Sequence, residues 1–356
     1  RLRIPRRQTD PKKQRLAIAL IGIFLLVVIG ILVAGYVIIF VLPPRQLVVR
    51  VDDVKYTRGD LVKLLRLRQF GSEYMGPEFY SPGTDIFQAL QVVVENEIIA
   101  KSAPKFGITV SSQEVDTEIR RLLMPNANES AGKSPEQIER EFRERYRSYL
   151  NAIQLSRNEH HDLIHKTLLR EKLRQFIGER VPAVAEQVHF HRIAMWPGDE
   201  IDIMQIKYKD AVADAITPED IQGAFKEIVR EFSRDIPELV RRGGDMGWVP
   251  KRIYEDYDHR FFDLEIGKLS EPTDNVNNPR EILFFLVSDR ALARELDSEL
   301  RDILKTRALQ DWLNEERDNY DVFSDFNSEI YSWLVVQLGL TSKLTPTPQP
   351  SSPFGF

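Results

Sequence analysis

The longest apolar pattern in the chain runs from Leu16 to Leu42, where no charged residue interrupts the segment LAIALIGIFLLVVIGILVAGYVIIFVL. About 20 consecutive apolar residues span the hydrocarbon core of a bilayer, so this segment is long enough to cross one with some tilt. A surface helix of a soluble domain keeps a polar face, and this segment has none. Pro43 and Pro44 end the predicted helix. We therefore expect one transmembrane helix over residues 16–42.

The segment before this helix, residues 1–15, contains seven Lys or Arg residues and one Asp, a net charge of +6. The positive-inside rule places this basic segment in the cytoplasm and everything after Pro44 outside it. A cleaved signal peptide is the alternative. Its apolar region is normally about 7–15 residues long and ends at a small-residue cleavage site. The longer segment here, without such a site, favours an uncleaved anchor in the cell membrane with an extracytoplasmic bulk.

After the anchor the pattern becomes that of amphipathic helices. Residues 47–57 alternate around an Asp-Asp turn, which predicts a short hairpin. From residue 58 to 180 apolar residues recur at helical spacing without a strand pattern. Capping boxes mark two of the helix starts, Ser111 with Glu114 and Ser156 with Glu159. This part of the chain is therefore predicted to be a helical domain.

The following part mixes strand and helix patterns. Residues 187–195 alternate like a strand, 217–234 have a helical pattern, and 281–288 form a continuous apolar run typical of a buried strand. Residues 291–317 then predict a long helix with one apolar face, and 328–338 predict a short amphipathic one. The expected fold class is α+β.

Composition excludes several kinds of function. The whole chain has a net charge of −5, so the residues after the basic segment together carry −11. An acidic surface does not attract nucleic-acid phosphates, and we expect no nucleic-acid partner. The chain has no cysteine, which excludes disulfides, thiol catalysis and cysteine-bound zinc.

Several motifs carry a resemblance to known families. Residues 243–248 (GGDMGW), 261–273 (FFDLEIGKLSEPT) and 231–235 (EFSRD) resemble the pattern of the parvulin-type (PpiC) peptidyl-prolyl cis-trans isomerases, or rotamases. Residues 51–68 and 89–119 resemble the helices of SurA/PrsA-type chaperone domains. With its anchor, the chain is similar to membrane-anchored PpiD-type foldases of bacteria.

The resemblance implies a domain organisation in which the helix after the isomerase domain returns to pack on the chaperone domain. The expected parts are a cytoplasmic segment (1–15), the transmembrane helix (16–42), a SurA-like helical chaperone domain (43–185), a parvulin-like domain (186–290), the returning helix (291–320), and a short amphipathic helix with a disordered Pro/Ser-rich tail (321–356).

The resemblance also implies candidate site residues. Prolyl isomerisation needs no nucleophile or cofactor, because the enzyme only has to favour a twisted X–Pro amide. In parvulins an apolar, aromatic pocket lies beside a hydrogen-bonded cluster of two histidines and an Asp or Cys. Asp235 matches the Asp/Cys position and is the candidate catalytic residue. Trp248, Ile253 and Tyr257 match the substrate-binding pocket.

Both family histidines are replaced in this chain. Their positions hold Arg192 and Leu283, while His191 is one residue off and would face the other side of its strand. A buried Arg needs a partner, and a salt bridge from Arg192 to Asp235 is a local solution. We expect the isomerase activity to be weak or absent, while a competent isomerase remains the alternative.

The other histidines give weaker signals. His161 and His165 lie four residues apart on a predicted helix, which is the spacing of a zinc pair, but no third ligand is visible and a solvated face is the simpler interpretation. His189 and His191 share a strand face and are expected to be surface or interface residues. We expect no metal and no cofactor.

The sequence favours a membrane-anchored extracytoplasmic foldase or chaperone. Its expected clients are unfolded, newly secreted or proline-containing polypeptides, and the secretion machinery is a candidate partner. The alternative is a non-enzymatic structural or adaptor subunit of a membrane complex that uses the same scaffold. A solvent-exposed apolar cleft would favour the chaperone, and a sealed surface the adaptor.

Overall fold

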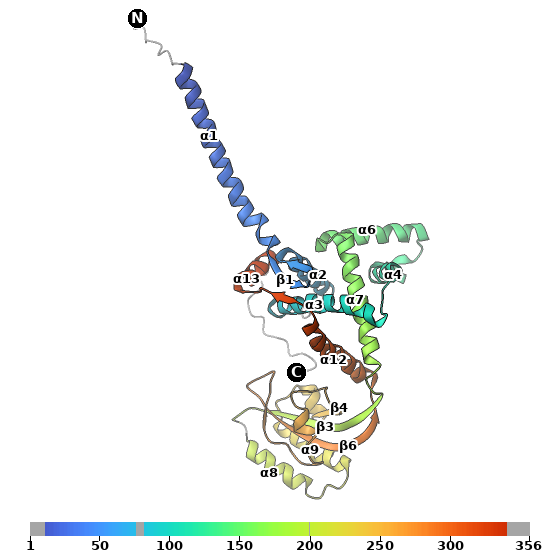
Figure 1. Cartoon of the computed structure of the whole chain (residues 1–356). Helices are drawn as coiled ribbons and strands as arrows, with labels where there is room; N and C mark the ends of the chain where they lie inside the picture. Colours follow the sequence, from blue (N-terminus) through green and yellow to red (C-terminus); the bar gives the residue numbers. More distant parts are fainter. Residues whose placement is uncertain (1–10, 76–81, 199, 340–356) are drawn as a thin grey trace. The chain divides into compact units, whose positions relative to one another are not determined.

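The computed structural model describes residues 11–75, 82–198 and 200–339 (Figure 1). Residues 1–10 of the predicted cytoplasmic segment and residues 340–356 of the predicted tail lie outside these ranges. The described residues form two compact units. The first contains residues 11–170 and 316–339, and the second contains residues 171–315. The predicted domain limits, 43–185 and 186–290, remain a prediction.

The apolar segment forms the helix predicted for it. Helix α1 covers Pro11–Tyr36 and continues into the wider turns of η1, Val37–Val41, before Pro43 opens the short η2, Pro43–Arg45. From Leu20 to Val41 the mean hydropathy is 3.1, and none of this stretch is buried within the protein. Among the described residues, this is the single helix long and apolar enough to cross a membrane, judged by length and composition.

A small sheet anchors the first unit. Strands β1, Leu47–Val51, and β2, Val54–Thr57, form the predicted hairpin around the Asp-Asp turn, in which Asp52 adopts a positive φ of 51°. The other edge of β1 pairs antiparallel with β7, Val322–Ser324, giving the order β2-β1-β7. Strand β7 was not predicted from the sequence. It pairs a segment near the end of the described residues with the strand that follows the apolar helix.

Helices make up the rest of the first unit. They are α2 (Arg58–Met75), α3 (Pro82–Ser102), η4 (Ala103–Phe106), α4 (Ser112–Leu123), α5 (Ala127–Ser130), α6 (Pro135–Ile153), α7 (Arg157–Gly178), η5 (Arg317–Asn319) and α13 (Ser328–Gln337). Both predicted capping boxes are present. Apolar residues of α4, α6 and α7 form one core, which contains Val115, Phe142 and Ile164. The strand-free pattern predicted for residues 58–180 is therefore confirmed up to Gly178.

The second unit is built on a four-stranded antiparallel sheet of order β4-β3-β6-β5 (Figure 1). Its strands are β3 (Val184–Met195), β4 (Asp245–Pro250), β5 (Thr273–Asp274) and β6 (Ile282–Glu295). Helices α8 (Ile201–Val212) and α9 (Pro218–Phe232) pack on one face, where they cover Ile193, Met195 and Phe284. The other face carries a second core around Phe190, Phe261 and Phe285.

Three short or late elements complete this unit: α10 (Pro237–Arg241), α11 (Asp258–Phe261) and α12 (Ser298–Glu316). The helix predicted to begin at residue 291 begins at Ser298 instead, because β6 continues to Glu295 and pairs with the start of β3. Helix α8 and strand β4 were also not predicted. The predicted strands over 187–195 and 281–288 and the predicted helix over 217–234 are present as β3, β6 and α9.

Candidate functional site

The candidate catalytic residue, Asp235, is held in a buried ion pair. Its side chain is 4 % exposed and accepts from the guanidinium of Arg192, which is 10 % exposed. The other carboxylate oxygen accepts the backbone N–H of Ala194 at 3.0 Å. The salt bridge expected from the sequence is therefore present. Arg192 and the Ala194 N–H, both on β3, occupy the Asp235 carboxylate. Asp235 is therefore paired with a cation and not with a neutral side chain that both donates and accepts, as histidine does.

The second family histidine position, Leu283, lies on β6 and is buried next to this pair. Leu283 and Arg192 border a cavity of about 10 Å³, which is the space of about one water molecule. The cavity is lined by Phe190, Arg192, Met246, Tyr254, Tyr257, Phe261, Leu283 and Phe285. The rings of Phe190 and Phe261 stack with centroids 4.6 Å apart. Aromatic side chains therefore fill most of the space around Leu283.

The structure brings only part of the predicted substrate-binding set to this cavity. Tyr257 lines it, and its hydroxyl accepts the backbone N–H of Val276 at 2.9 Å. Trp248 instead stacks on His189, with ring centroids 5.4 Å apart. Ile253 is buried, does not line the cavity, and accepts a 3.0 Å hydrogen bond from Arg307 at its carbonyl.

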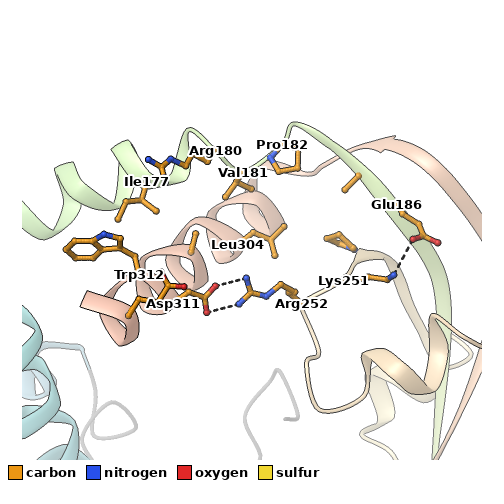
Figure 2. A pocket seen from close by; sticks show the side chains of 14 residues that line it. Ile177, Arg180, Val181, Pro182, Glu186, Lys251, Arg252, Leu304, Asp311 and Trp312 are labelled. Carbon is orange, nitrogen blue, oxygen red and sulfur yellow. Dashed lines mark hydrogen bonds and ion pairs between the residues drawn. The ribbon is translucent and has the colours of Figure 1, made fainter. Parts of the chain in front are cut away.

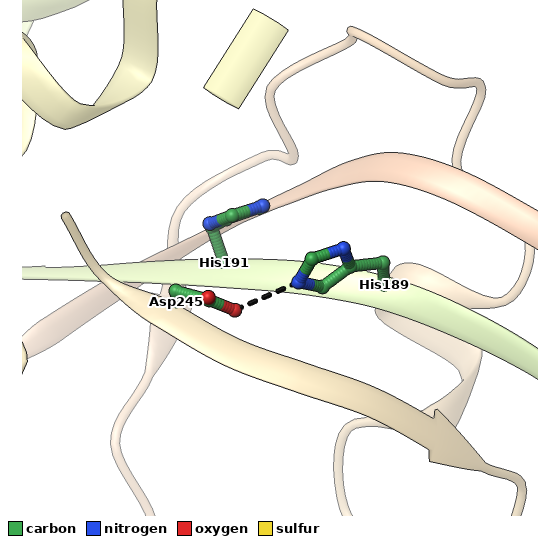
Figure 3. A group of neighbouring side chains, drawn as sticks. All are labelled: His189, His191 and Asp245. Atoms are coloured by element: carbon green, nitrogen blue, oxygen red, sulfur yellow. Dashed lines mark hydrogen bonds and ion pairs between the residues drawn. The ribbon is translucent and has the colours of Figure 1, made fainter. Parts of the chain in front are cut away.

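A different polar cluster lies on the α9 face of the same sheet. Residues 189, 191, 193 and 195 of β3 point to this face by strand alternation, and Asp245 of β4 lies opposite His191 in the register. The pairing of β3 is irregular at two places: with β4 between Phe190 and His191, and with β6 between His189 and Phe190. Figure 3 shows His189, His191 and Asp245 gathered together.

The protonation states of this cluster follow from its surroundings. Burial lowers the pKa of His191 to about 4, so its imidazole is neutral at physiological pH. Burial raises the pKa of Asp245, but hydrogen bonds from His189 and from the backbone of Gly247 lower it more, to about 2. The distances are 2.8 Å from His189 Nε2 and 2.7 Å from Gly247 N.

The interpretation of His191 as a surface residue is wrong, because it is 2 % exposed. Helix α9 covers it and places the ring of Phe225 edge-on to its imidazole, 6.0 Å between centroids. The sequence signal for the cluster is a His-x-His pair on one strand with the Asp of a Gly-Gly-Asp turn on the next. The turn itself matches expectation, since Gly243 and Gly244 have φ values of +72° and +74°.

The second unit also has an open hollow of about 490 Å³ (Figure 2). Apolar side chains line much of it: Ile177, Val181, Pro182, Pro250, Leu304, Ala308 and Trp312. Charged residues stand at its rim, where Arg252 pairs with Asp311 at 2.7 Å and Lys251 with Glu186 at 3.5 Å. Trp312 is half-buried there. Hollows of about 300–1,000 Å³ with this mixed lining are typical of ligand sites.

A second hollow, of about 350 Å³, lies in the first unit between α2, α3 and α7. Leu64, Leu67, Val92 and Val93 are among the residues that line it.

Comparison with known proteins identifies the family of this first part of the chain. The family model of the SurA-like N-terminal domain matches residues 11–174. Residues 11–174 form a SurA-like N-terminal domain. No curated protein matches the chain.

Three solved structures are similar to the chain at low identity. Peptidylprolyl isomerase PrsA from Bacillus anthracis is 15 % identical over 72 % of this chain and 97 % of its own, with a TM-score of 0.34. Foldase protein PrsA from Streptococcus pneumoniae is 12 % identical over 83 % and 94 %, with a TM-score of 0.33. A SurA-like chaperone of Campylobacter jejuni is 16 % identical over 59 % and 89 %, with a TM-score of 0.23. These TM-scores do not establish a common fold for the whole chain.

One wall of the hollow in the SurA-like domain is a buried polar network. Lys166 of α7 donates to Glu97 of α3 at 2.5 Å and to Asp162 at 2.8 Å. The hydroxyl of Tyr56 donates to the same Glu97 carboxylate. Burial, followed by the interactions with Glu97, raises the pKa of Tyr56 above its ordinary value. The network joins β2, α3 and α7, and sequence reasoning missed it because its members are far apart in the chain.

The histidine pair of the SurA-like domain lacks the geometry of a metal site. His161 Nε2 lies 3.5 Å from Asp116, and both His161 and His165 line a shallow hollow that also contains Arg157. Among the described residues, His189, His191 and Asp245 are the only group of three potential ligands with ligand atoms within 4.8 Å of one another.

Proposed function

We propose that this protein is a membrane-anchored extracytoplasmic foldase that holds unfolded polypeptides and has weak or no prolyl isomerase activity. The observation that carries this proposal is the SurA-like N-terminal domain over residues 11–174. The open, partly apolar hollows in both units favour a protein that binds exposed apolar segments of a client. A scaffolding adaptor would instead be expected to present sealed surfaces.

The reduced isomerase activity rests on the geometry of the second unit. An isomerase of the parvulin type has to admit a proline ring beside a neutral hydrogen-bonding cluster. Here the corresponding space is about 10 Å³, and the corresponding side chains are Leu283 and an Arg192–Asp235 ion pair. Leu neither donates nor accepts hydrogen bonds and Arg only donates, so the pair cannot replace two histidines.

For client binding we assign the hollow of Figure 2. Its apolar floor would take the side chains of an extended segment, and its rim of both charges would meet the client backbone and polar side chains without selecting a sequence. Such weak, unselective contacts suit a foldase that meets many unfolded or newly secreted chains. The secretion machinery is a candidate source of these chains.

The variant Trp312→Ala tests this assignment. It removes the largest side chain that lines the hollow, and Trp196→Ala is the matched control because Trp196 is 54 % exposed and lies outside it. Light scattering of a chemically unfolded client, diluted into buffer with the full chain in detergent micelles, reports the delay of aggregation. We expect Trp312→Ala to shorten the delay several-fold and Trp196→Ala to leave it unchanged. Equal delays for all three proteins would place client binding elsewhere.

Membrane anchoring rests on α1 and the charge before it. The helix offers an apolar surface on all sides, and residues 1–15 carry a net charge of +6. Reporter fusions after Arg50 and after Phe356 should both give the extracytoplasmic signal. A cytoplasmic signal at either position would overturn the orientation and the role in secretion.

A further inference from the structure

Three ligand-type side chains converge on the α9 face of the second unit without a role in the proposed holding function. His189 and His191 of β3 and Asp245 of β4 each offer a ligand atom within 4.8 Å of the other two (Figure 3). In a tetrahedral zinc site with bonds of about 2.0–2.1 Å, ligand atoms lie about 3.3 Å apart. Small side-chain rotations therefore suffice to close the group around a cation.

The hydrogen bonds around His191 determine which of its nitrogens is free. When the Ser288 hydroxyl donates to the carbonyl of His189 at 3.3 Å, its oxygen accepts from His191 Nε2, 3.0 Å away. With its proton on Nε2, the neutral imidazole keeps the lone pair of Nδ1 unprotonated. Nδ1 has no hydrogen-bond partner, although the residue is 2 % exposed. A buried unpaired acceptor of this kind is costly for a fold and is the form in which histidine binds a metal.

Asp245 and His189 supply the other two ligands. Both hydrogen bonds to Asp245, from His189 Nε2 and Gly247 N, go to Oδ1, and its side chain is 35 % exposed. Its second oxygen receives neither of these two hydrogen bonds. Metal binding at Nε2 of His189 requires the neutral tautomer with its proton on Nδ1, and it replaces the hydrogen bond from Nε2 to Asp245. Gln222 lies 3.3 Å from Nδ1 and can accept through its amide oxygen after a flip.

We propose that His189, His191 and Asp245 bind one divalent transition-metal cation of the zinc class. Two imidazoles and one carboxylate are a ligand set that zinc prefers, and three protein ligands leave a position for water or a client group. The bound cation would link β3 to β4 beside the Gly-Gly-Asp turn.

Metal titration of the full chain in detergent tests the proposal. After treatment with a chelator, the protein is titrated with Zn²⁺ in competition with a chromophoric chelator, and with Co²⁺ to observe the visible absorption of a four-coordinate ion. We expect one equivalent bound with a Kd in the micromolar range or below, and a Zn²⁺-dependent rise in Tm. If the protein binds no stoichiometric Zn²⁺ at a concentration of 100 µM, the proposal is overturned.

Variants assign the binding to these residues. His189→Gln and Asp245→Asn are expected to weaken Zn²⁺ binding at least 100-fold, and Gln222→Ala by about 10–100-fold through the loss of its support to His189. The matched control is the double variant His161→Ala/His165→Ala, which removes the other histidine pair and should bind Zn²⁺ as the unaltered chain does. The metal-free Tm shows that each variant is folded. Binding that follows His161 and His165 instead would contradict the assignment.

Discussion

At the scale of single residues, the sequence predicted the ion pair between Arg192 and Asp235 correctly, but it predicted the positions of some other side chains poorly. The ion pair between Arg192 and Asp235 follows from one rule, that a buried charge needs a partner, and it is present. The placement of Trp248 depends on which face of β4 it occupies, and the pairing of β4 with β3 is irregular here, because Met246 lies as an extra residue between the partners of Phe190 and His191. The motif alone carries no information about such an irregularity.

The first prediction concerns this buried pair. Asp235→Ala removes an acceptor from both Arg192 and the Ala194 N–H, so a buried cation and a buried backbone donor each lose a hydrogen bond. Breaking a buried ion pair from one side costs about 3–5 kcal/mol, and we expect that loss in the free energy of unfolding measured with urea. The control, Glu227→Ala, breaks an exposed pair with Arg230 on α9 and should cost less than about 0.5 kcal/mol. Equal losses would show that Asp235 is not buried as described.

The second prediction is a pH dependence at the capping box of α7. A hydrogen bond from Lys63, followed by those of Ser156, lowers the pKa of Glu159 to about 2, below its ordinary value of 4.5. The folded state therefore binds this proton less readily than the unfolded state, and the stabilisation is present above pH 4.5 and is lost as the pH falls towards 2.

Glu159→Gln keeps a capping group but cannot titrate. The stability difference between the unaltered protein and this variant, measured by urea unfolding, should be of the order of 1 kcal/mol at pH 6 and should shrink between pH 4.5 and pH 2.5. The small magnitude reflects the 41 % exposure of the Glu159 side chain. A difference that is constant across this range would contradict the ion pair with Lys63.

At the scale of elements, the helices with capping boxes and long apolar stripes were predictable, and the short strands were not. Strand β7 is three residues long and exists because the edge of β1 is available to pair with it. Helix α12 begins later than its apolar pattern suggested, because β6 extends along β3. Both outcomes depend on tertiary pairing, which a local pattern does not contain.

The third prediction concerns α13, which packs on the other helices of the first unit and stabilises that unit. Leu334 is fully buried, and Arg58 of α2, which is 2 % exposed, pairs with Glu329 at 2.9 Å and lies over the Trp333 ring. Leu334→Ala should lower the free energy of unfolding by about 2–5 kcal/mol.

The matched control is Val336→Ala two residues further on, where the side chain is 59 % exposed and the effect should stay within about 0.5 kcal/mol. Thermal or urea unfolding followed by circular dichroism measures both variants. If the two substitutions are equally mild, α13 does not dock on the first unit.

At the scale of the whole molecule, the second unit is an insertion in the sequence of the first. The chain leaves the first unit after Arg170 and returns at Glu316. Arg170 donates to Asn96 of α3 at 2.9 Å, and Ser102 of the same helix donates to Glu316 at 2.9 Å. Six residues of helix separate these two contacts, a rise of about 9 Å, so the two ends of the interrupted unit lie close together.

The fourth prediction follows from this closeness. A chain in which about eight Gly/Ser residues replace 171–315 has a linker whose r.m.s. span, about 16 Å, is sufficient to close the gap. We expect it to keep helical circular dichroism and a cooperative unfolding transition in detergent. Removing 316–339 instead should cause aggregation, because β1 loses β7 and α2 loses α13. If the variant with the linker in place of 171–315 is unfolded while the variant without 316–339 stays soluble, the two-unit organisation is contradicted.

The measurement that tests the central claim most directly is the refolding of a client whose slow phase is limited by a proline cis–trans step. One time course, recorded with and without the full chain in micelles, reports the slow rate constant and the final yield of native client together. Because the cavity beside Arg192 and Leu283 measures only about 10 Å³ and Arg192 is paired with Asp235, the account predicts an unchanged slow rate constant and a higher yield. A slow phase accelerated in proportion to the concentration of the protein, with no gain in yield, would contradict it.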